Sequence, residues 1–243
     1  MNRIRALIFD MGGTLYCPTL DHEVLWHYFL KQVGIIKPDE FTLSDIEEAL
    51  VKPDEWLTDY MIENNVESHW EPDFEMWVEY ETRLFNELGL EEDPVEVVRY
   101  QQSHLLDALD HFGNKITEDC KYTLHELKSR GYLIALASNR FGDPVPHLDK
   151  SSILSYFDTI EYTNVPGYKK PSPFLLLRVA EELDVNPRTC AFIGDKIHSD
   201  VTAARRAEMS PVLITQCGAS EPKTIPDDVI KINALSDLLE IFE

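Results

Sequence analysis

The chain has 243 residues, of which 44% are hydrophobic and 27% are charged, a composition typical of a soluble globular protein with one domain and an insertion. Its formal net charge is -22, so we expect no nucleic-acid partner, because a phosphate backbone is bound by basic surfaces. No apolar segment approaches the ~20 residues of a membrane-spanning helix, so we expect no membrane partner. The first predicted strand begins almost at Met1 and leaves no room for a signal peptide, so we expect a cytoplasmic protein.

The negative charge is concentrated in one part of the chain. Between Tyr16 and Asp110 there are 24 acidic and 5 basic residues, against 20 and 17 in the remainder. We interpret the acidic segment as a solvated surface that keeps the protein soluble. A basic protein partner for this surface, or a cationic or neutral substrate tail, is left open.

The first predicted element is a short apolar strand, Ile4 to Phe9, which ends at Asp10. From Asp21 to Asp110 the apolar residues recur at helical spacing, with Gly and Pro between the runs. We therefore predict a helical domain at residues 16–110, inserted into a core domain of residues 1–15 and 111–243. The predicted helices of the insert are Glu23 to Val33, Leu43 to Val51, Glu55 to Asn64, Asp73 to Leu88 and Val95 to Asp110.

After Phe112 the pattern changes to strands alternating with helices. Such alternation favours a parallel sheet covered on both faces. The predicted fold class is α/β, with a three-layer Rossmann-like parallel-sheet core and an inserted α-helical domain. The predicted strands are Tyr132 to Ala137, Thr159 to Tyr162, Thr189 to Ile193, Val212 to Thr215 and Val229 to Ile232, and the helices are Thr117 to Gly131, Ser172 to Leu183, Ser199 to Ala207 and Ala234 to Phe242.

The four cysteines are scattered through the chain without CxxC spacing. This distribution indicates neither a zinc site nor a disulfide framework. We predict reduced, mostly buried thiols at Cys17, Cys120, Cys190 and Cys217.

Polar residues follow several of the predicted strands. Asp10 lies where parallel sheets place their ligands, and its carboxylate could serve as a nucleophile, although a turn residue is an equal interpretation for Asp10 alone. The hydroxyl of Ser138 and the amides after it, beginning with Asn139, suit an anionic oxygen. Lys170 adds a positive charge for the same oxygen. Asp10, Asp195 and Asp200 offer the hard oxygens that Mg²⁺ requires.

Each of these residues alone also has a structural interpretation. Ser138 and Asp200 are common helix caps, Asp195 a common turn residue, and Lys170 an ordinary solvent-exposed charge. Their joint occurrence at strand ends favours a common site.

With these motifs in place, the chain resembles the haloacid dehalogenase (HAD) superfamily. The resemblance rests on the sequence FDMGGTL around Asp10, on Ser138, on Lys170 before Pro171, and on Gly194-Asp195 with Asp200. The helical insert between the first two motifs is similar to the C1-type cap domain of that superfamily. The motifs are specific for fold and nucleophile and much less so for substrate.

The resemblance implies a Mg²⁺-dependent hydrolase, typically a phosphatase acting on a small phosphorylated metabolite through an aspartyl phosphate. By the resemblance, Asp10 is the nucleophile, and Thr14 orients it. Ser138, Asn139 and Lys170 bind the phosphoryl group. The Mg²⁺ ligands are Asp10, the carbonyl of Gly12, Asp195 and Asp200.

The chain departs from the superfamily pattern at Gly12. Phosphatases of the superfamily usually carry an aspartate there, which protonates the leaving oxygen and then activates water. Loss of a general acid/base typically costs about 10² to 10⁴ in rate. One interpretation is that a histidine of the insert replaces it, and His22, His27 and His69 are the candidates.

Two further interpretations of Gly12 change the substrate. The leaving group needs no proton if it is an acyl or aryl phosphate, or a halide as in dehalogenases, although Asp195 and Asp200 favour phosphoryl chemistry. A phosphonatase-like enzyme would use a lysine of the insert, for which Lys52 is the candidate. A non-catalytic binding or regulatory protein on the same fold is the alternative outside enzymes. We favour an enzyme, because a protein without catalysis has little use for this set of polar residues together: Asp10, Ser138, Lys170, Asp195 and Asp200.

Overall fold

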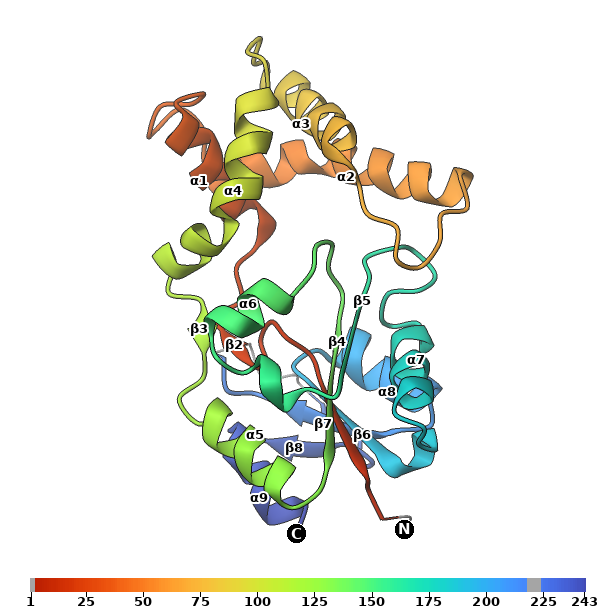
Figure 1. Ribbon diagram of the computed structural model, residues 1–243. Coiled ribbons are helices and arrows are strands. Elements are labelled where there is room, and N and C mark those ends of the chain that lie inside the picture. Colours follow the sequence, from red (N-terminus) through yellow and green to blue (C-terminus); the bar gives the residue numbers. More distant parts are fainter. Residues whose placement is uncertain (1–2, 218–223) are drawn as a thin grey trace. The chain divides into compact units, whose positions relative to one another are not determined.

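Strand β1, Ala6–Phe9, is the centre of the fold, and all four of its side chains are buried. The computed structural model describes residues 3–217 and 224–243 (Figure 1). Within them, β1 pairs in parallel with β4 (Leu133–Ser138) on one side and β6 (Cys190–Gly194) on the other. The six-stranded parallel sheet has the order β5-β4-β1-β6-β7-β8. The remaining strands are β5 (Thr159–Tyr162) and β8 (Ile230–Ile232) at the edges, and β7 (Ser210–Ile214) between β6 and β8.

Two apolar clusters cover the two faces of this sheet. Leu7 and Phe9 of β1 belong to one cluster and Ala6 and Ile8 to the other, because successive side chains of a strand point to opposite faces. Figure 1 shows α5 and α9 on one face and α7 and α8 on the other. The predicted three-layer α/β core is therefore confirmed. The covering helices are α5 (Cys120–Ser129), α7 (Phe174–Glu182), α8 (Thr202–Arg206) and α9 (Leu238–Ile241).

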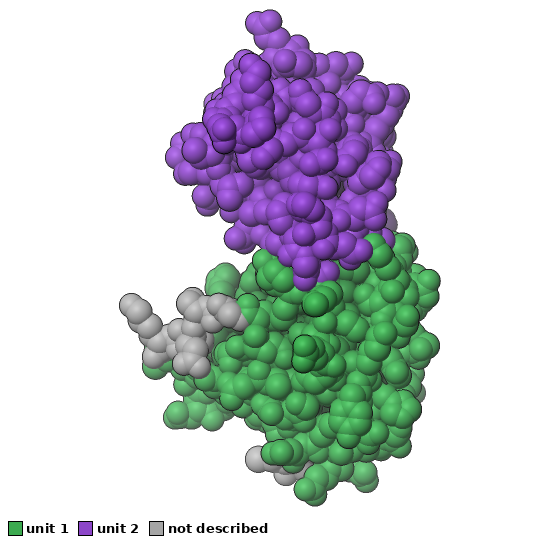
Figure 2. Space-filling model, turned by 90° about the vertical axis from the view of Figure 1, so that its left-hand side faces the viewer, with its two compact units in different colours: residues 1–19, 115–243 green, residues 20–114 purple. Residues whose placement is uncertain are grey.

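Four helices stand between β2 (Tyr16–Cys17) and β3 (Lys115–Ile116) in the chain, in the segment that was predicted to be a helical insert. The chain divides into two compact units, residues 1–19 with 115–243 and residues 20–114, which Figure 2 colours separately. The domain boundaries at residues 15 and 110 stay a prediction. No helix in the described ranges is long and apolar enough to cross a membrane. The helices of the second unit are α1 (His22–Val33), α2 (Leu43–Glu63), α3 (Phe74–Leu88) and α4 (Val95–His111).

Helix α2 corrects one sequence prediction. A break was predicted at Pro53, but α2 runs through it without interruption. Pro53 is itself buried, on the face that carries Ile46, Ala49, Leu50, Leu57 and Met61. Burial of this apolar face outweighs the helix-breaking tendency of proline, which costs about 3 kcal/mol in a helix interior.

Several short elements were not predicted. The predicted helix from Ser199 to Ala207 is a π-helical turn, Ile197–Val201, followed by α8. The predicted last helix is a 3₁₀ turn, Leu235–Asp237, followed by α9. The other short elements are the antiparallel strands β2 (Tyr16–Cys17) and β3 (Lys115–Ile116), helix α6 (Val145–Lys150), and the 3₁₀ turns Leu154–Tyr156 and Pro187–Thr189.

The cysteines provide a second correction. Cys17 and Cys217 form a disulfide, with their Cα atoms 5.4 Å apart. Cys120 and Cys190 are buried free thiols, as predicted. The prediction of reduced thiols was wrong for the first pair, because 200 residues separate them and no local spacing reveals their proximity.

Candidate active site

The carboxyl ends of β1, β4 and β6 bring the predicted site residues to one edge of the sheet. Phe9 of β1 is in register with both Leu136 and Ile193, and the N–H of Asp10 donates to the carbonyl of Ile193 (2.9 Å). From β1 the chain proceeds to β4 on one side and later returns to β6 on the other. Such a reversal of strand order opens the crevice where α/β sheets bind ligands.

A tight loop after Asp10 is closed by main-chain hydrogen bonds. The N–H groups of Leu15 and Tyr16 donate to the carbonyl of Met11 (2.9 and 3.0 Å), and the N–H of Gly13 donates to the carbonyl of Tyr16 (2.9 Å). Gly13 has a φ of +77°, and a Cβ there would lie 2.2 Å from Oδ2 of Asp195. Only glycine allows the loop to approach that carboxylate so closely.

Gly12, its neighbour, is in a different environment. A Cβ at Gly12 would meet no heavy atom within 4 Å, so a side chain can be added there without a clash at that atom. Thr14 is fully buried, and its hydroxyl has no hydrogen-bond partner among the described residues. The orienting role of Thr14 and the metal-binding role of the Gly12 carbonyl stay predictions.

Lys170 links the acidic residues of the site. Its Nζ donates to Oδ1 of Asp10 (2.7 Å) and lies 2.9 Å from Oδ1 of Asp200. The ammonium also lies 4.9 Å from the centroid of the Phe192 ring on β6. Only 2% of the lysine side chain is exposed, so its charge acts in an environment that screens it weakly.

Asp200 is fixed by the π-helical turn that carries it. The N–H of Lys196 donates to Oδ2 of Asp200 (2.9 Å), and the hydroxyl of Ser199 donates to Oδ1 (3.1 Å). Gly194 makes room for it, because a Cβ at position 194 would lie 2.5 Å from the Cβ of Asp200. Asp200 thus presents a carboxylate whose position is determined from three sides.

Three carboxylates form a group that could hold a metal ion. Asp10, Asp195 and Asp200 each offer an oxygen, and these oxygens lie within 4.8 Å of one another. Burial and the negative charges of Asp200 and Asp10 raise the pKa of Asp195 to about 7. Burial likewise raises the pKa of Asp10, against the opposing effect of Lys170. Burial alone would lower the pKa of Lys170, but Asp10 and Asp200 outweigh it and raise that pKa.

The environment of Asp195 fits a divalent cation. Its Oδ1 atom is buried and has no hydrogen-bond partner in the part of the chain that the structure describes. One ammonium cannot neutralise three carboxylates, and Mg²⁺ binds oxygen ligands of this kind. A cation here would pair with the unpartnered oxygen and relieve the repulsion that, in addition to burial, raises the pKa of Asp195.

The strand β4 ends at Ser138, which is buried at the same edge as Asp10. Its neighbour Asn139 is directed elsewhere. The Asn139 amide exchanges two hydrogen bonds with the main chain of Lys170. Direct contacts of Ser138, Asn139 and Lys170 with substrate stay predictions.

Sequence reasoning assigned no role to three residues that shape this site. Gly13 and Gly194 allow close approach of Asp195 and Asp200, and Phe192 lies beneath the ammonium of Lys170. A glycine three positions after Asp10 and another directly before Asp195 were the available signals for the first two. Phe192 carried no signal, because an apolar residue in a buried strand is expected on packing grounds alone.

The candidate proton donors and imine-forming lysine of the insert lie in the second unit. Lys52 forms an ion pair with Glu87 (2.7 Å), and 67% of its side chain is exposed. Lysines that form imines are typically desolvated by burial, whereas most of the Lys52 side chain is exposed. Among the histidines, His27 has a buried Nε2 atom without a hydrogen-bond partner within the described ranges.

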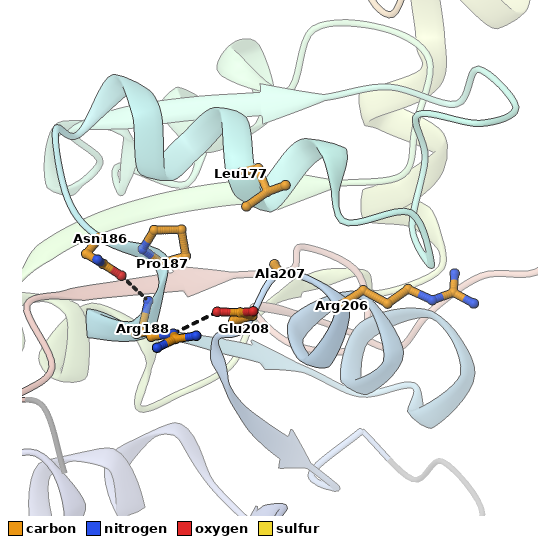
Figure 3. Close-up of a pocket in the computed structure, with 7 residues that line it drawn as sticks. All are labelled: Leu177, Asn186, Pro187, Arg188, Arg206, Ala207 and Glu208. Atoms are coloured by element: carbon orange, nitrogen blue, oxygen red, sulfur yellow. Dashed lines mark hydrogen bonds and ion pairs between the residues drawn. The ribbon is translucent and has the colours of Figure 1, made fainter.

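A surface hollow of about 460 Å³ has a different lining, and Figure 3 shows the residues that form it. Arg188 pairs with Glu208 there (2.7 Å), and the side chain of Arg206 points away from the hollow. None of the predicted site residues lines it. The lining residues are Leu177, Asn186, Pro187, Arg188, Arg206, Ala207 and Glu208.

Comparison with known proteins places this geometry in a family. The family description "haloacid dehalogenase-like hydrolase" matches residues 4–208, which is most of the chain. The chain therefore belongs to the haloacid dehalogenase-like hydrolases.

Relatives within the family differ in their chemistry. A phosphoglycolate phosphatase of Aquifex aeolicus is 24% identical over 241 residues, which cover 99% of this chain and 97% of the relative. A 2-haloacid dehalogenase of Pseudomonas syringae has a similar structure, with a TM-score of 0.67, 17% identity, and coverage of 98% and 97%. The magnesium-bound HAD-hydrolase YfnB of Bacillus subtilis gives a TM-score of 0.63 at 17% identity, with full coverage of both chains. At such identities the structural similarity establishes the fold alone. Whether the nucleophile attacks phosphorus or carbon must be argued from the residues of the site.

Proposed function

We propose that this chain is a Mg²⁺-dependent phosphohydrolase that acts on a small phosphorylated metabolite through an aspartyl phosphate on Asp10. The observation that supports it is the carboxylate group of Asp10, Asp195 and Asp200 around the buried ammonium of Lys170. Carbon-centred displacement of a halide has no need of three converging carboxylates. The similarity to a phosphoglycolate phosphatase over nearly the whole chain supports the same choice.

The residues that would hold Mg²⁺ are Asp10, Asp195 and Asp200, together with the carbonyl of Gly12. Their oxygens are of the type the ion prefers, and the buried, unpartnered Oδ1 of Asp195 is available to it. When bound there, Mg²⁺ supplies positive charge that offsets the negative charge of the reacting phosphoryl group.

The first chemical step is attack by Asp10 on phosphorus. A bond forms between a carboxylate oxygen of Asp10 and phosphorus, and the bond from phosphorus to the ester oxygen breaks, with its electron pair remaining on that oxygen. Lys170 and the hydroxyl of Ser138 hold phosphoryl oxygens during the transfer, while Asp200 keeps the ammonium in place (2.9 Å).

The second step hydrolyses the aspartyl phosphate. A water molecule attacks phosphorus, the bond to Asp10 breaks, and inorganic phosphate leaves with the Asp10 carboxylate restored. Position 12 carries no acid to protonate the leaving oxygen or to activate this water. We therefore expect substrates with good leaving groups, such as acyl or aryl phosphates, to react much faster than alkyl phosphates.

Hydrolysis of three phosphates tests this proposal. Para-nitrophenyl phosphate, acetyl phosphate and glycerol phosphate are assayed with and without Mg²⁺. We expect Mg²⁺-dependent turnover of the first two by the wild-type protein. Asp10→Asn removes the nucleophile and should lower every rate by at least about 10⁴-fold, since loss of a catalytic nucleophile costs up to about 10⁶. The control is Asp149→Asn, an exposed aspartate of α6, which should leave the rates unchanged.

Gly12→Asp tests the missing acid within the same experiment. A Cβ at Gly12 meets no heavy atom within 4 Å, so we expect the variant to fold. It should raise the rate with glycerol phosphate by about 10² to 10⁴. If no variant hydrolyses any phosphate, the phosphatase proposal is rejected, and a carbon-centred or non-catalytic role takes its place.

A further inference from the structure

The side chain of Asn139 forms a two-bond pair with the main chain of Lys170. Nδ2 of Asn139 donates to the Lys170 carbonyl (2.8 Å), and the Lys170 N–H donates to Oδ1 of Asn139 (2.8 Å). Two parallel hydrogen bonds fix both the position and the rotation of the peptide groups that they hold. The residues are 31 positions apart, so the pair ties the end of β4 to a distant loop.

Lys170 lies in a loop that needs such an anchor. It stands between β5 and α7, outside any helix or strand of the structure. Its ammonium is nonetheless buried and must reach Asp10 and Asp200 at once. A loop main chain free to shift by an ångström would carry the ammonium away from both carboxylates, and displacements of that size cost about 10²-fold in rate.

We propose that the Asn139 side chain is a positioning residue for Lys170: it holds the main chain at Lys170 so that the ammonium bridges Asp10 and Asp200. This inference rests on the proposed function for its effect on rate. It concerns the Asn139 side chain only, and the binding of phosphoryl oxygen by the amides after Ser138 stays a prediction. The residue acts through Lys170, because its amide oxygen and nitrogen are both engaged by the main chain of that lysine.

Strand β4 makes Asn139 a suitable anchor. Asn139 directly follows Ser138, the last residue of a strand that pairs with β1 on one side and β5 on the other. The anchor is therefore attached to the same rigid edge that carries Asp10. A second hydrogen bond, from Nη1 of Arg206 to the Pro171 carbonyl (2.9 Å), holds the loop one residue further on, but Arg206 is exposed and its bond competes with water.

A double-mutant cycle tests the proposal, with acetyl phosphate as substrate. Asn139→Ala should lower kcat by about 10- to 100-fold in the wild-type background. In the Lys170→Met background, which lacks the ammonium, the same change should lower kcat by less than about twofold, because a residue that acts through Lys170 has nothing left to position. An equal loss in both backgrounds overturns the proposal and assigns Asn139 a direct contact with substrate or a general structural role.

Amide hydrogen exchange tests the anchor without turnover. Exchange of the Lys170 N–H should be at least about tenfold faster in Asn139→Ala than in wild type, because the protecting acceptor is lost. The matched control is Asn164→Ala, which removes an asparagine bonded to the side chain of Lys169 (3.4 Å) and should change neither exchange at Lys170 nor kcat. Unchanged exchange in Asn139→Ala, or faster exchange with unchanged kcat, overturns the inference. An inactive wild-type protein instead rejects the proposed function, and exchange then still decides whether the anchor exists.

Discussion

The two compact units of this chain use charged side chains in opposite ways. Unit 1, residues 1–19 and 115–243, is nearly balanced in charge but buries Asp10, Lys170 and Asp200 together at a strand edge. Unit 2, residues 20–114, has 24 acidic residues against 5 basic ones, yet Glu81 alone is buried among the acids that the structure describes there. Unit 2 therefore has the larger excess of charge, but unit 1 has the buried charged side chains. Burial is the better guide to the site of chemistry.

After that of Asp10, the largest expected effect comes from Asp195 in unit 1. Asp195→Asn removes a charge from the carboxylate group and should lower Mg²⁺-dependent turnover about 10³-fold, equivalent to about 4 kcal/mol in the barrier. The free energy of unfolding without Mg²⁺ should not fall, because the charge removed is one that its neighbours repel. Steady-state assays and isothermal titration with Mg²⁺ measure the first effect, and urea unfolding in a chelator measures the second. A marked loss of stability would mean that Asp195 serves the fold, and the contrast between the units would weaken.

The disulfide should have the next largest effect. Cys17 and Cys217 close a loop of 200 residues and link the segment after the Asp10 loop to the segment after β7. Opening such a loop in the unfolded chain costs roughly 2 to 5 kcal/mol of stability. Urea unfolding with and without a dithiol reductant measures the difference. Cys17→Ser is the control, since it should have the stability of the reduced protein and no further response to reductant.

Glu81 should give unit 2 a pH-dependent stability. Burial raises the pKa of Glu81 to about 7 from 4.5, despite hydrogen bonds from Gln101 and Trp26. Between pH 4.5 and 7 the unfolded chain releases the proton first, so the free energy of unfolding falls as the pH rises. Above pH 7 the full cost, roughly 3 kcal/mol, is present.

Glu81→Gln measures this contribution. The amide oxygen can accept the same two hydrogen bonds without a charge, so the variant should gain stability at pH 8 but not at pH 4. Fluorescence-monitored urea unfolding reports on unit 2, because all four tryptophans lie there. Glu79→Gln, at an exposed neighbouring position, is the control. At urea concentrations below the unfolding transition, the catalytic rates of both variants should match wild type. A lower rate in Glu81→Gln alone would mean that unit 2 contributes to catalysis.

The smallest expected effect distinguishes two adjacent glycines. Gly13→Ala places a Cβ against Asp195 at a positive φ and should cost about 2 kcal/mol of stability as well as Mg²⁺ affinity. Gly12→Ala is the matched control and should do neither, because its Cβ meets nothing within 4 Å. Thermal unfolding with and without Mg²⁺ compares the two variants. Equal behaviour would contradict the close approach of Gly13 to Asp195.

The sequence predicted what depends on local pattern. The strands before Asp10, Ser138 and Asp195 are unbroken apolar runs, as buried parallel strands must be, so their ends and their common edge could be predicted. The helices of unit 2 were found by their spacing, and only the break at Pro53 was wrong, because an apolar face can bury a proline.

What the sequence could not predict depends on contacts between distant residues. The bonds of Asn139 with Lys170 span 31 positions and the Cys17–Cys217 disulfide spans 200, and neither leaves a periodic signal. Asp200 was predicted as a site residue, but its π-helical turn was not, although the bond between its carboxylate and the Lys196 N–H joins residues only four positions apart. The sequence pattern was enough to predict which residues lie at the site, but their hydrogen-bond and disulfide partners could be identified only from the tertiary structure.

The place of β1 in the sheet has a consequence for folding during synthesis. β1 is made first, but its neighbours β4 and β6 begin only at Leu133 and Cys190. This apolar strand, which is buried on both faces in the folded protein, therefore has no pairing strand until more than half of the chain has been synthesised. The helices of unit 2 are complete by residue 111 and contact one another, so they can fold while β1 is still without partners. We therefore expect the inserted unit to fold first during synthesis, and the sheet of unit 1 to form last, although its first strand is made before any of the inserted helices.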